Sequence, residues 1–140
     1  EITTEGGLDV SGQLKDISTA VTVLKKRGIF VSLFIDPDPA QVEASISTGA
    51  DAVELHTGCY ANAYKTAGCD QEWTRLRRAA FEAAKGGLLV FAGHGLDYLN
   101  VGRIKEIPEI SEVNIGFAII AMAVMVGLPA AVSDMKNLVR

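Results

Sequence analysis

Cysteine is scarce in this 140-residue sequence, which contains only Cys59 and Cys69. Two cysteines without a second pair provide neither a disulfide framework nor the ligand spacing of a zinc cluster, and no secretory leader precedes them. We therefore expect reduced thiols, no bound metal and a cytoplasmic protein. The chain begins at Glu1 without a methionine, inside a predicted loop, which is more typical of a fragment than of a natural terminus.

Basic clusters and an uninterrupted membrane span are also missing. Thirteen Lys and Arg residues are scattered among seventeen acids, with a net charge of −4. This distribution argues against a nucleic-acid partner and favours a small phosphorylated or neutral ligand. Residues 113–133 carry no charge and approach the length of a span, but Asn114, Gly116, Gly127 and Pro129 interrupt them. We therefore expect no membrane partner.

The residues that are present alternate between two periodicities. With 49% hydrophobic residues, the chain is long enough for one core, so residues 1–140 are predicted to form a single domain. A helix capped by Asp9 or Ser11 should run to about Arg27 and end at Gly28. Strands are predicted at residues 29–35, 52–56, 88–92 and 113–115. Helices should follow them from Pro39, at 71–85 and 101–106, and at 119–126 and 129–139, with a long loop at 57–70.

Strands separated by helices predict a parallel sheet, which could be doubly wound or half of a barrel. A doubly wound sheet normally has a glycine-rich phosphate turn after its first strand, but Asp36-Pro37-Asp38-Pro39 stands there. The glycine-bearing strand ends come last, at Gly93-His94-Gly95 and Gly116, as in barrels that bind phosphate beyond their last strands. The pattern favours an α/β fold that is half of a (β/α)₈ TIM barrel, with four parallel strands and outer helices.

Polar residues at the predicted strand ends are candidates for chemistry. Glu54 and His56 are two residues apart in a strand, so both project to one face. A carboxylate and an imidazole lining one cavity can act as acid, base or electrostatic groups, although a satisfied polar pair inside the sheet is the alternative. His94 lies between two glycines, where a ligand can approach closely, or it is a turn histidine without function. Gly116 precedes an apolar helix whose first amides could bind phosphate.

Several strings, in order and with matching spacing, resemble the pyridoxine 5′-phosphate synthase family along the whole chain. They are TTEGGLDV at 3–10, SLFID at 32–36, ELHTGCYA at 54–61, AGHGL at 92–96 and NIG at 114–116. The resemblance implies the second half of a barrel. It also implies a reaction that condenses 1-deoxy-D-xylulose 5-phosphate with 3-amino-2-oxopropyl phosphate, releasing water and inorganic phosphate. Members of the family need no metal or redox cofactor and assemble as homo-oligomers.

The resemblance assigns roles to named positions. His94 is implied to be a proton donor and Glu54 a group that stabilises charge in the transition state. Thr3 would contact the pentulose phosphate, Gly95 would lie against a bound ligand, and Gly116 with Phe117 would hold the phosphate of the amino ketone. The first four strands of the family supply a catalytic histidine, a catalytic glutamate and basic phosphate ligands. We expect this chain alone not to perform the full reaction.

The chain departs from the family pattern at the expected lumen. Phe91 stands where the family usually has Asn, Phe117 where it has a phosphate-site His, Ala121 where it has Gly, and Met122 where it has Arg. These changes add apolar bulk or remove polarity, so only backbone donors would remain at the phosphate site. They fit either a non-catalytic half-barrel scaffold that self-associates through an apolar lumen face, or divergence within the family. Because a half-barrel leaves its lumen face and two sheet edges uncovered, we expect a homo-oligomer.

Overall fold

The computed structural model describes residues 6–139 and forms one parallel sheet with helices around it. The elements in chain order are α1 (Leu14–Lys25), β1 (Ser32–Ile35), α2 (Pro39–Thr48), β2 (Ala52–His56), α3 (Gly58–Ala63), α4 (Cys69–Lys85), β3 (Leu89–Gly93), the 3₁₀ helix η1 (Val101–Glu106), β4 (Ile110–Asn114), α5 (Phe117–Val126) and α6 (Leu128–Val139). The four strands lie in the order β1-β2-β3-β4, and every neighbouring pair is parallel. This is the architecture of half a TIM barrel, as predicted.

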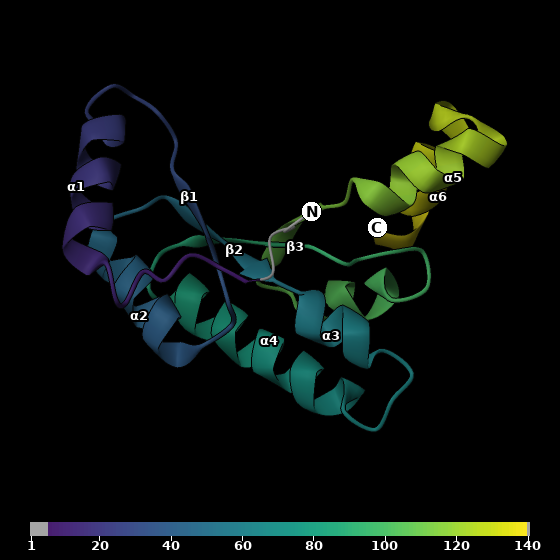
Figure 1. Cartoon of the computed structure of the whole chain (residues 1–140), viewed down its shortest axis with the longest axis horizontal. Coiled ribbons are helices and arrows are strands. Elements are labelled where there is room, and N and C mark those ends of the chain that lie inside the picture. The colour runs from purple at the N-terminus through teal and green to yellow at the C-terminus, as the bar shows by residue number, and fades with distance from the viewer. Residues whose placement is uncertain (1–5, 140) are drawn as a thin grey trace.

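Alternation along the strands separates a covered face of the sheet from an open one. Leu33 and Ile35 in β1 and Val53 and Leu55 in β2 are buried, whereas Phe34 and Glu54, which point the other way, are only half-buried. Helices α2 and α4 pack together and contact the strands, and they lie below the sheet in Figure 1. The residues that point away from these helices therefore line an inner face with no helix across it, and we call this surface the inner face.

The turn after β1 follows directly from its sequence. Pro39 occupies the first turn of α2, where its missing N–H costs nothing, and the Asp38 side chain accepts a hydrogen bond from the amide of Ala40 at 2.9 Å. Gly49 ends the helix at φ 74°, a left-handed conformation that glycine adopts without strain. The Asp-Pro-Asp-Pro string thus turns the chain back over the sheet.

Two local predictions were wrong. Neither Asp9 nor Ser11 caps α1, which begins after Gln13 without a side-chain cap. The Asp9 carboxylate instead accepts hydrogen bonds from the Gly12 amide and the Gln41 side chain, so it ties the segment before α1 to α2. The predicted loop at 57–70 contains helix α3, and α4 begins two residues earlier than expected. The remaining helices and strands agree with the predicted ranges to within a few residues.

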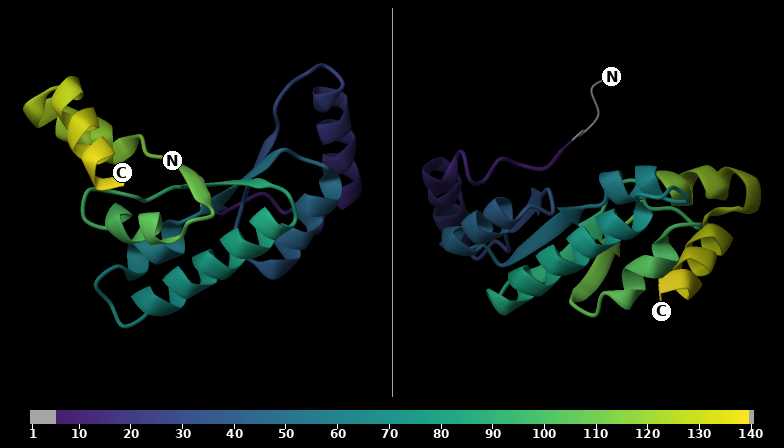
Figure 2. Two further views of the ribbon diagram at one scale, coloured as in Figure 1. Left: turned by 180° about the vertical axis from the view of Figure 1, so that it is seen from behind. Right: turned by 90° about the horizontal axis from the view of Figure 1, so that it is seen from below.

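The last two helices form a hairpin at the opposite end of the molecule from α1 (Figures 1 and 2). Tyr98 donates a hydrogen bond to the Ala131 carbonyl at 2.8 Å, and Ala131 and Met135 of α6 are buried. Helix α5 is apolar throughout, yet it buries none of its residues, and Val124 and Met125 are each 81% exposed. Within residues 6–139, no helix is both long enough and apolar enough to cross a membrane.

The alternation predicts that two leucines on neighbouring strands differ in their contribution to stability. Leu55 is fully buried under the helices, whereas Leu89 is 51% exposed. Leu55→Ala should lower the free energy of unfolding by about 2–5 kcal/mol, because it leaves a cavity in the core. The matched variant Leu89→Ala should change it by about 0.5 kcal/mol. Urea unfolding followed by circular dichroism measures both, and equal losses would show that the helices do not cover the predicted face.

Candidate active site

The carboxyl ends of three strands bring chemically useful residues to one level of the sheet. The register pairs His56 of β2 with Gly93 of β3, and Gly93 with Asn114 of β4. Two residues earlier in each strand, Glu54 pairs with Phe91. Because side chains alternate along a strand, these residues all point to the inner face. The site therefore begins as a row across the sheet rather than as a sequence motif.

Glu54 reaches across β3 to the next strand. Its carboxylate accepts a hydrogen bond from the Asn114 side-chain amide at 2.8 Å. A Cβ atom at Gly93, which lies between them, would stand 2.1 Å from the Glu54 Oε1 atom. Glycine at this position leaves room for the carboxylate in the place where it meets Asn114. The half-buried Glu54 side chain therefore lies on the inner face, joined to Asn114 of β4.

His56 is buried and held at one nitrogen. Its side chain is 6% exposed, and Nδ1 lies 3.0 Å from the Asp36 Oδ1 atom. The edge of its ring packs against Phe34, with ring centroids 5.2 Å apart. The ring of His94 is tilted against the same imidazole at 4.6 Å. Two strand ends thus bring the two histidines of the sequence into direct contact.

His94 has an unusual backbone conformation. Its φ is 78°, in the left-handed region that residues with a Cβ rarely adopt, and Gly95 follows at φ 74°. Such a conformation costs on the order of 1–3 kcal/mol, and it persists only where surrounding contacts impose it. Thr57 provides these contacts, because its buried hydroxyl lies 2.7 Å from the Gly93 carbonyl and 2.6 Å from the His94 carbonyl. The His94 side chain itself is exposed and can exchange protons with a ligand or water.

The loop after His94 is anchored a few residues further on. The Asn100 side-chain amide donates to the Gly95 carbonyl at 3.1 Å, and its carbonyl oxygen accepts from the Asp97 amide. Tyr60 of α3 donates its hydroxyl to the Asn100 backbone carbonyl at 2.6 Å. Burial raises the pKa of Tyr60 to about 12, so the hydroxyl stays protonated and remains a donor. The conformation at His94 is therefore supported from both sides.

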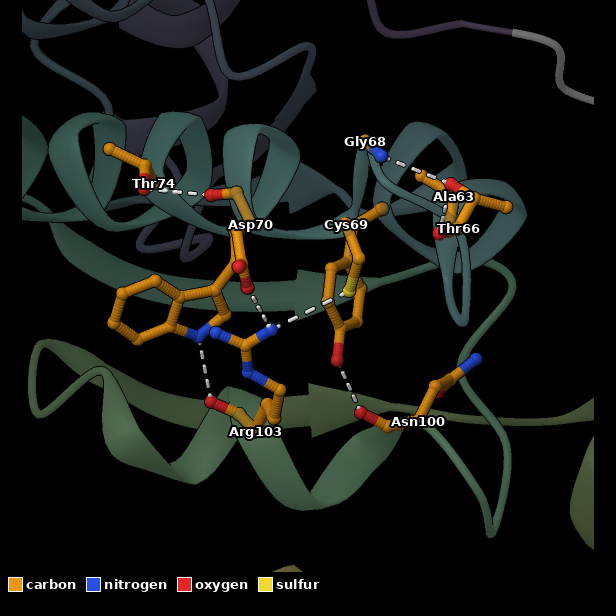
Figure 3. Close-up of polar contacts among 10 residues, drawn as sticks. Ala63, Thr66, Gly68, Cys69, Asp70, Thr74, Asn100 and Arg103 are labelled. Atoms are coloured by element: carbon orange, nitrogen blue, oxygen red, sulfur yellow. Dashed lines mark hydrogen bonds and ion pairs between the residues drawn. The ribbon is translucent and has the colours of Figure 1, made fainter.

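A second cluster fixes η1 against α4 (Figure 3). Arg103 forms an ion pair with Asp70 at 2.7 Å, and the same nitrogen lies 3.5 Å from the Cys69 sulfur. Its guanidinium stacks over Trp73, whose indole N–H donates to the Arg103 carbonyl at 3.0 Å. The hydrogen bond with Asp70 holds the pKa of Arg103 above its usual value. These contacts place Asn100, and through it the loop that carries His94.

The remaining predicted site residues differ in how they are placed. Gly116 precedes α5 as its cap residue, two positions after Asn114, and a Cβ there would meet nothing within 4 Å. Phe117 opens the helix and is 89% exposed, so it does not fill the lumen. Phe91 does lie on the inner face, where it stacks on Phe30 with centroids 6.4 Å apart. Thr3 lies outside the described residues.

Sequence reasoning missed part of this arrangement. Asp36 was interpreted only as a turn residue, and Thr57 was placed in a loop without a role. The available signal was positional, because Asp36 follows the end of β1 directly and Thr57 follows the end of β2. In a parallel sheet these ends meet at one edge. The hydrogen bond between Asn114 and Glu54 had no signal in the sequence, because the two residues are 60 positions apart.

A surface groove of the described residues lies away from these strand ends. It is an open depression of about 1300 Å³ on the outer side of α2 and α4, lined among others by Pro37, Trp73, Arg77 and Phe81. Its lining does not include Glu54, His56 or His94, so this groove is separate from the residues at the strand ends. Among residues 6–139, no group of three or more His, Cys, Asp or Glu side chains gathers in a way that could hold a metal ion.

Comparison with known proteins finds one family along the whole chain. The family model described as "Pyridoxal phosphate biosynthesis protein PdxJ" matches residues 1–140. The chain is 52% identical over 139 residues to the pyridoxine 5′-phosphate synthase of Sulfurihydrogenibium sp., covering 99% of this chain and 57% of that protein. It is 53% identical over 140 residues to the synthase of Magnetococcus marinus, covering 100% of this chain and 58% of that protein. The chain thus spans less than two thirds of these curated relatives.

The geometry around Gly93 predicts a selective effect of one added methyl group. Gly93→Ala should displace the Glu54 carboxylate and break its hydrogen bond to Asn114, because the new Cβ would occupy the position of Oε1. Gly102→Ala is the matched control, since a Cβ there meets nothing within 4 Å. Side-chain amide spectra of Asn114 by NMR report the hydrogen bond. An unchanged Asn114 signal in Gly93→Ala would contradict the proposed packing of Glu54.

Proposed function

The chain belongs to the PdxJ family of pyridoxal phosphate biosynthesis proteins, and we propose that it carries half of a site that builds the pyridine ring of vitamin B6. The substrates we propose are 1-deoxy-D-xylulose 5-phosphate and 3-amino-2-oxopropyl phosphate, with water and inorganic phosphate as the other products. The observation that carries this proposal is the exposed His94 in a strained, fully anchored backbone at the carboxyl edge of the sheet. Strain of this kind clusters at active sites.

His94 is the proposed proton donor. A ring-closing condensation with loss of water requires repeated proton transfers, and an imidazole can supply and recover protons near neutral pH. The exposure of the His94 side chain supports this role, as does its contact with the buried ring of His56. Gly95, also left-handed, would let a ligand approach the backbone next to the imidazole.

Glu54 is proposed to stabilise positive charge that develops on the substrates. A carboxylate in a fixed position needs no reorganisation when charge appears, which is the origin of most electrostatic catalysis. The hydrogen bond to Asn114 and the close packing against Gly93 support such a fixed position. The positive charge that we expect Glu54 to face is on the nitrogen of the amino ketone, as an ammonium or iminium group.

The phosphate of the amino ketone is proposed to bind at the start of α5. The first amides of the helix have no partners within the helix, and the helix dipole favours an anion there. Gly116 would allow close approach, because a Cβ at that position meets no neighbouring atom. Phe117 offers no polar side chain, so only backbone donors contribute. Thr3 is proposed to contact the pentulose phosphate.

The full reaction is proposed to require more than these residues. The chain covers 57% and 58% of the two synthases to which it is similar. By resemblance, the other part of such proteins supplies a catalytic histidine, a catalytic glutamate and basic phosphate ligands. We therefore propose that the 140 residues alone are inactive. A non-catalytic scaffold is not favoured, because the family is one of biosynthetic proteins.

Self-association is proposed to cover the apolar surfaces. The outer edge of β4 has no partner strand among the described residues, and the edge of β1 accepts one bond from the Leu8 amide. The inner face exposes Phe30 at 55%, and no residue of α5 is fully buried, although Ala118 and Ile119 pack against the core. A second copy that placed its β1 beside β4 would continue the parallel sheet toward a closed barrel. Burying each large apolar side chain contributes roughly 1.5–3 kcal/mol.

A test of function uses the chain rejoined to the amino-terminal part of a family member. This protein should show weak synthase activity, because His94 and Glu54 remain but Phe117 replaces the usual phosphate-site side chain. His94→Ala should reduce the rate on the order of 10²-fold or more. The rate of pyridoxine 5′-phosphate formation is measured directly.

The control is His94→Gly, which removes the ring and also relieves the left-handed strain at φ 78°. If His94 is kept for catalysis, His94→Gly should be inactive but no less stable to thermal unfolding than the unmodified chain. A variant that loses stability while keeping its rate would show a structural histidine. Turnover at the level of an intact synthase before any substitution would contradict the importance given to Phe117.

Assembly can be tested by one substitution on each face of the sheet. Phe91→Asn, on the inner face, should weaken the homo-oligomer or lower solubility, because it removes apolar surface that a second copy would cover. Phe81→Asn is the matched control, because Phe81 is also an exposed phenylalanine, at 52%, but lies on the outer helix α4. It should leave the assembly unchanged. Size-exclusion chromatography with light scattering gives the mass. A monomeric chain at high concentration would contradict association through the inner face.

A further inference from the structure

The buried imidazole of His56 has one nitrogen whose partner is clear. At neutral pH the Asp36 carboxylate offers only acceptor atoms, so the 3.0 Å contact requires a proton on the Nδ1 atom of His56. In a neutral ring the other nitrogen, Nε2, then holds a lone pair. Asp36 thereby selects one of the two tautomers of His56 and one orientation of its ring.

The Nε2 atom of His56 is buried and has no hydrogen-bond partner among residues 6–139. Buried polar atoms are nearly always paired, so an unpaired one is maintained by its surroundings and calls for an explanation. The residue is 5% exposed, and its position is set by Phe34 on one side and His94 on the other.

Gly58 marks the point at which the two histidine rings meet. A Cβ on Gly58 would lie 2.9 Å from both the Nε2 and Cε1 atoms of His56, and 3.2 Å from the Cδ2 atom of His94. Gly58 has no left-handed φ, so the backbone does not demand glycine. The space itself demands it, because the edges of both rings occupy the volume that any side chain would need.

We propose that Asp36 and His56 are positioning residues for His94. Asp36 holds His56 in a single tautomer, and the edge of His56 above Gly58 fixes where the His94 imidazole lies over the inner face. His94 is exposed and would otherwise sample several rotamers, since only its backbone is clamped by Thr57. Fixing its ring places the proton at a defined position before the substrate arrives. This assignment rests on the proposed role of His94.

The test is NMR of the 140-residue chain, which has only two histidines to assign. Ring ¹⁵N shifts report the tautomer, and ring-to-ring nuclear Overhauser effects report the contact at 4.6 Å. The expected result is a His56 ring protonated at Nδ1, with cross-peaks to His94. Asp36→Ala should mix the tautomers and weaken those cross-peaks. A wild-type His56 protonated at Nε2 would overturn the proposal by itself.

Two further variants separate positioning from general stability. Asp38→Ala removes a carboxylate from the same turn, one that caps α2 instead of contacting His56, and should leave both histidine spectra unchanged. Gly58→Ala keeps every polar group but should separate the rings and reduce the cross-peaks. If Asp36→Ala and Gly58→Ala both leave the tautomer and the cross-peaks of the wild type, the positioning pair does not exist.

A kinetic measurement connects the pair to catalysis. In the rejoined protein, Asp36→Ala should lower kcat roughly tenfold while KM stays nearly constant, because ligand binding does not depend on the pair. A larger change in KM than in kcat would overturn the positioning role. If the rejoined protein has no activity at all, the proposed function fails, whereas the NMR result still decides whether Asp36 and His56 hold the His94 ring.

Discussion

The missing side chain at Gly93 is the constraint on which the site depends. Parallel strands in register place His56, Gly93 and Asn114 at one level across three neighbouring strands. Because the middle position is empty, the Glu54 carboxylate can lie over β3 and accept a hydrogen bond from Asn114 at 2.8 Å. Any larger residue would push Glu54 out of the row. The strand register thus decides which side chains meet, and Gly93 leaves the space in which Glu54 and Asn114 do so.

The same carboxyl edge of the sheet contains the strained backbone of His94 and the hydrogen bonds that hold it in place. His94 in the left-handed region costs on the order of 1–3 kcal/mol. The Thr57 hydroxyl lies within hydrogen-bond distance of the Gly93 and His94 carbonyls and shares its one proton between them, and the Asn100 side chain donates to the Gly95 carbonyl. Each hydrogen bond of this kind contributes about 0.5–1.5 kcal/mol, so a few of them suffice to offset the strain. The left-handed conformation of His94 is therefore stabilised by its surroundings, although it is unfavourable for a residue with a Cβ atom.

The open surfaces of the chain contrast with this ordered edge. One face of the sheet is covered by α2 and α4, whereas the inner face and the whole of α5 carry apolar side chains in contact with solvent. A complete barrel would bury an inner face of this kind, and the chain covers less than two thirds of the synthases that it resembles. The two phenylalanines that depart from the family pattern lie in different surroundings. Phe91 stacks on Phe30, whereas Phe117 is almost fully exposed.

The sequence by itself determined the order of the four strands and of every helix except α3, the parallel sheet, and the shared face of Glu54 and His56. Periodicity and turn residues suffice for this because they act over a few positions. Asp38-Pro39 also predicted the start of α2 without any knowledge of the rest. Only the tertiary structure decided that Asp36 pairs with His56, 20 residues away, and that Thr57 clamps the backbone of His94, 37 residues away. Such contacts join residues that are far apart in the chain, and they form only when neighbouring strands pair in their observed register.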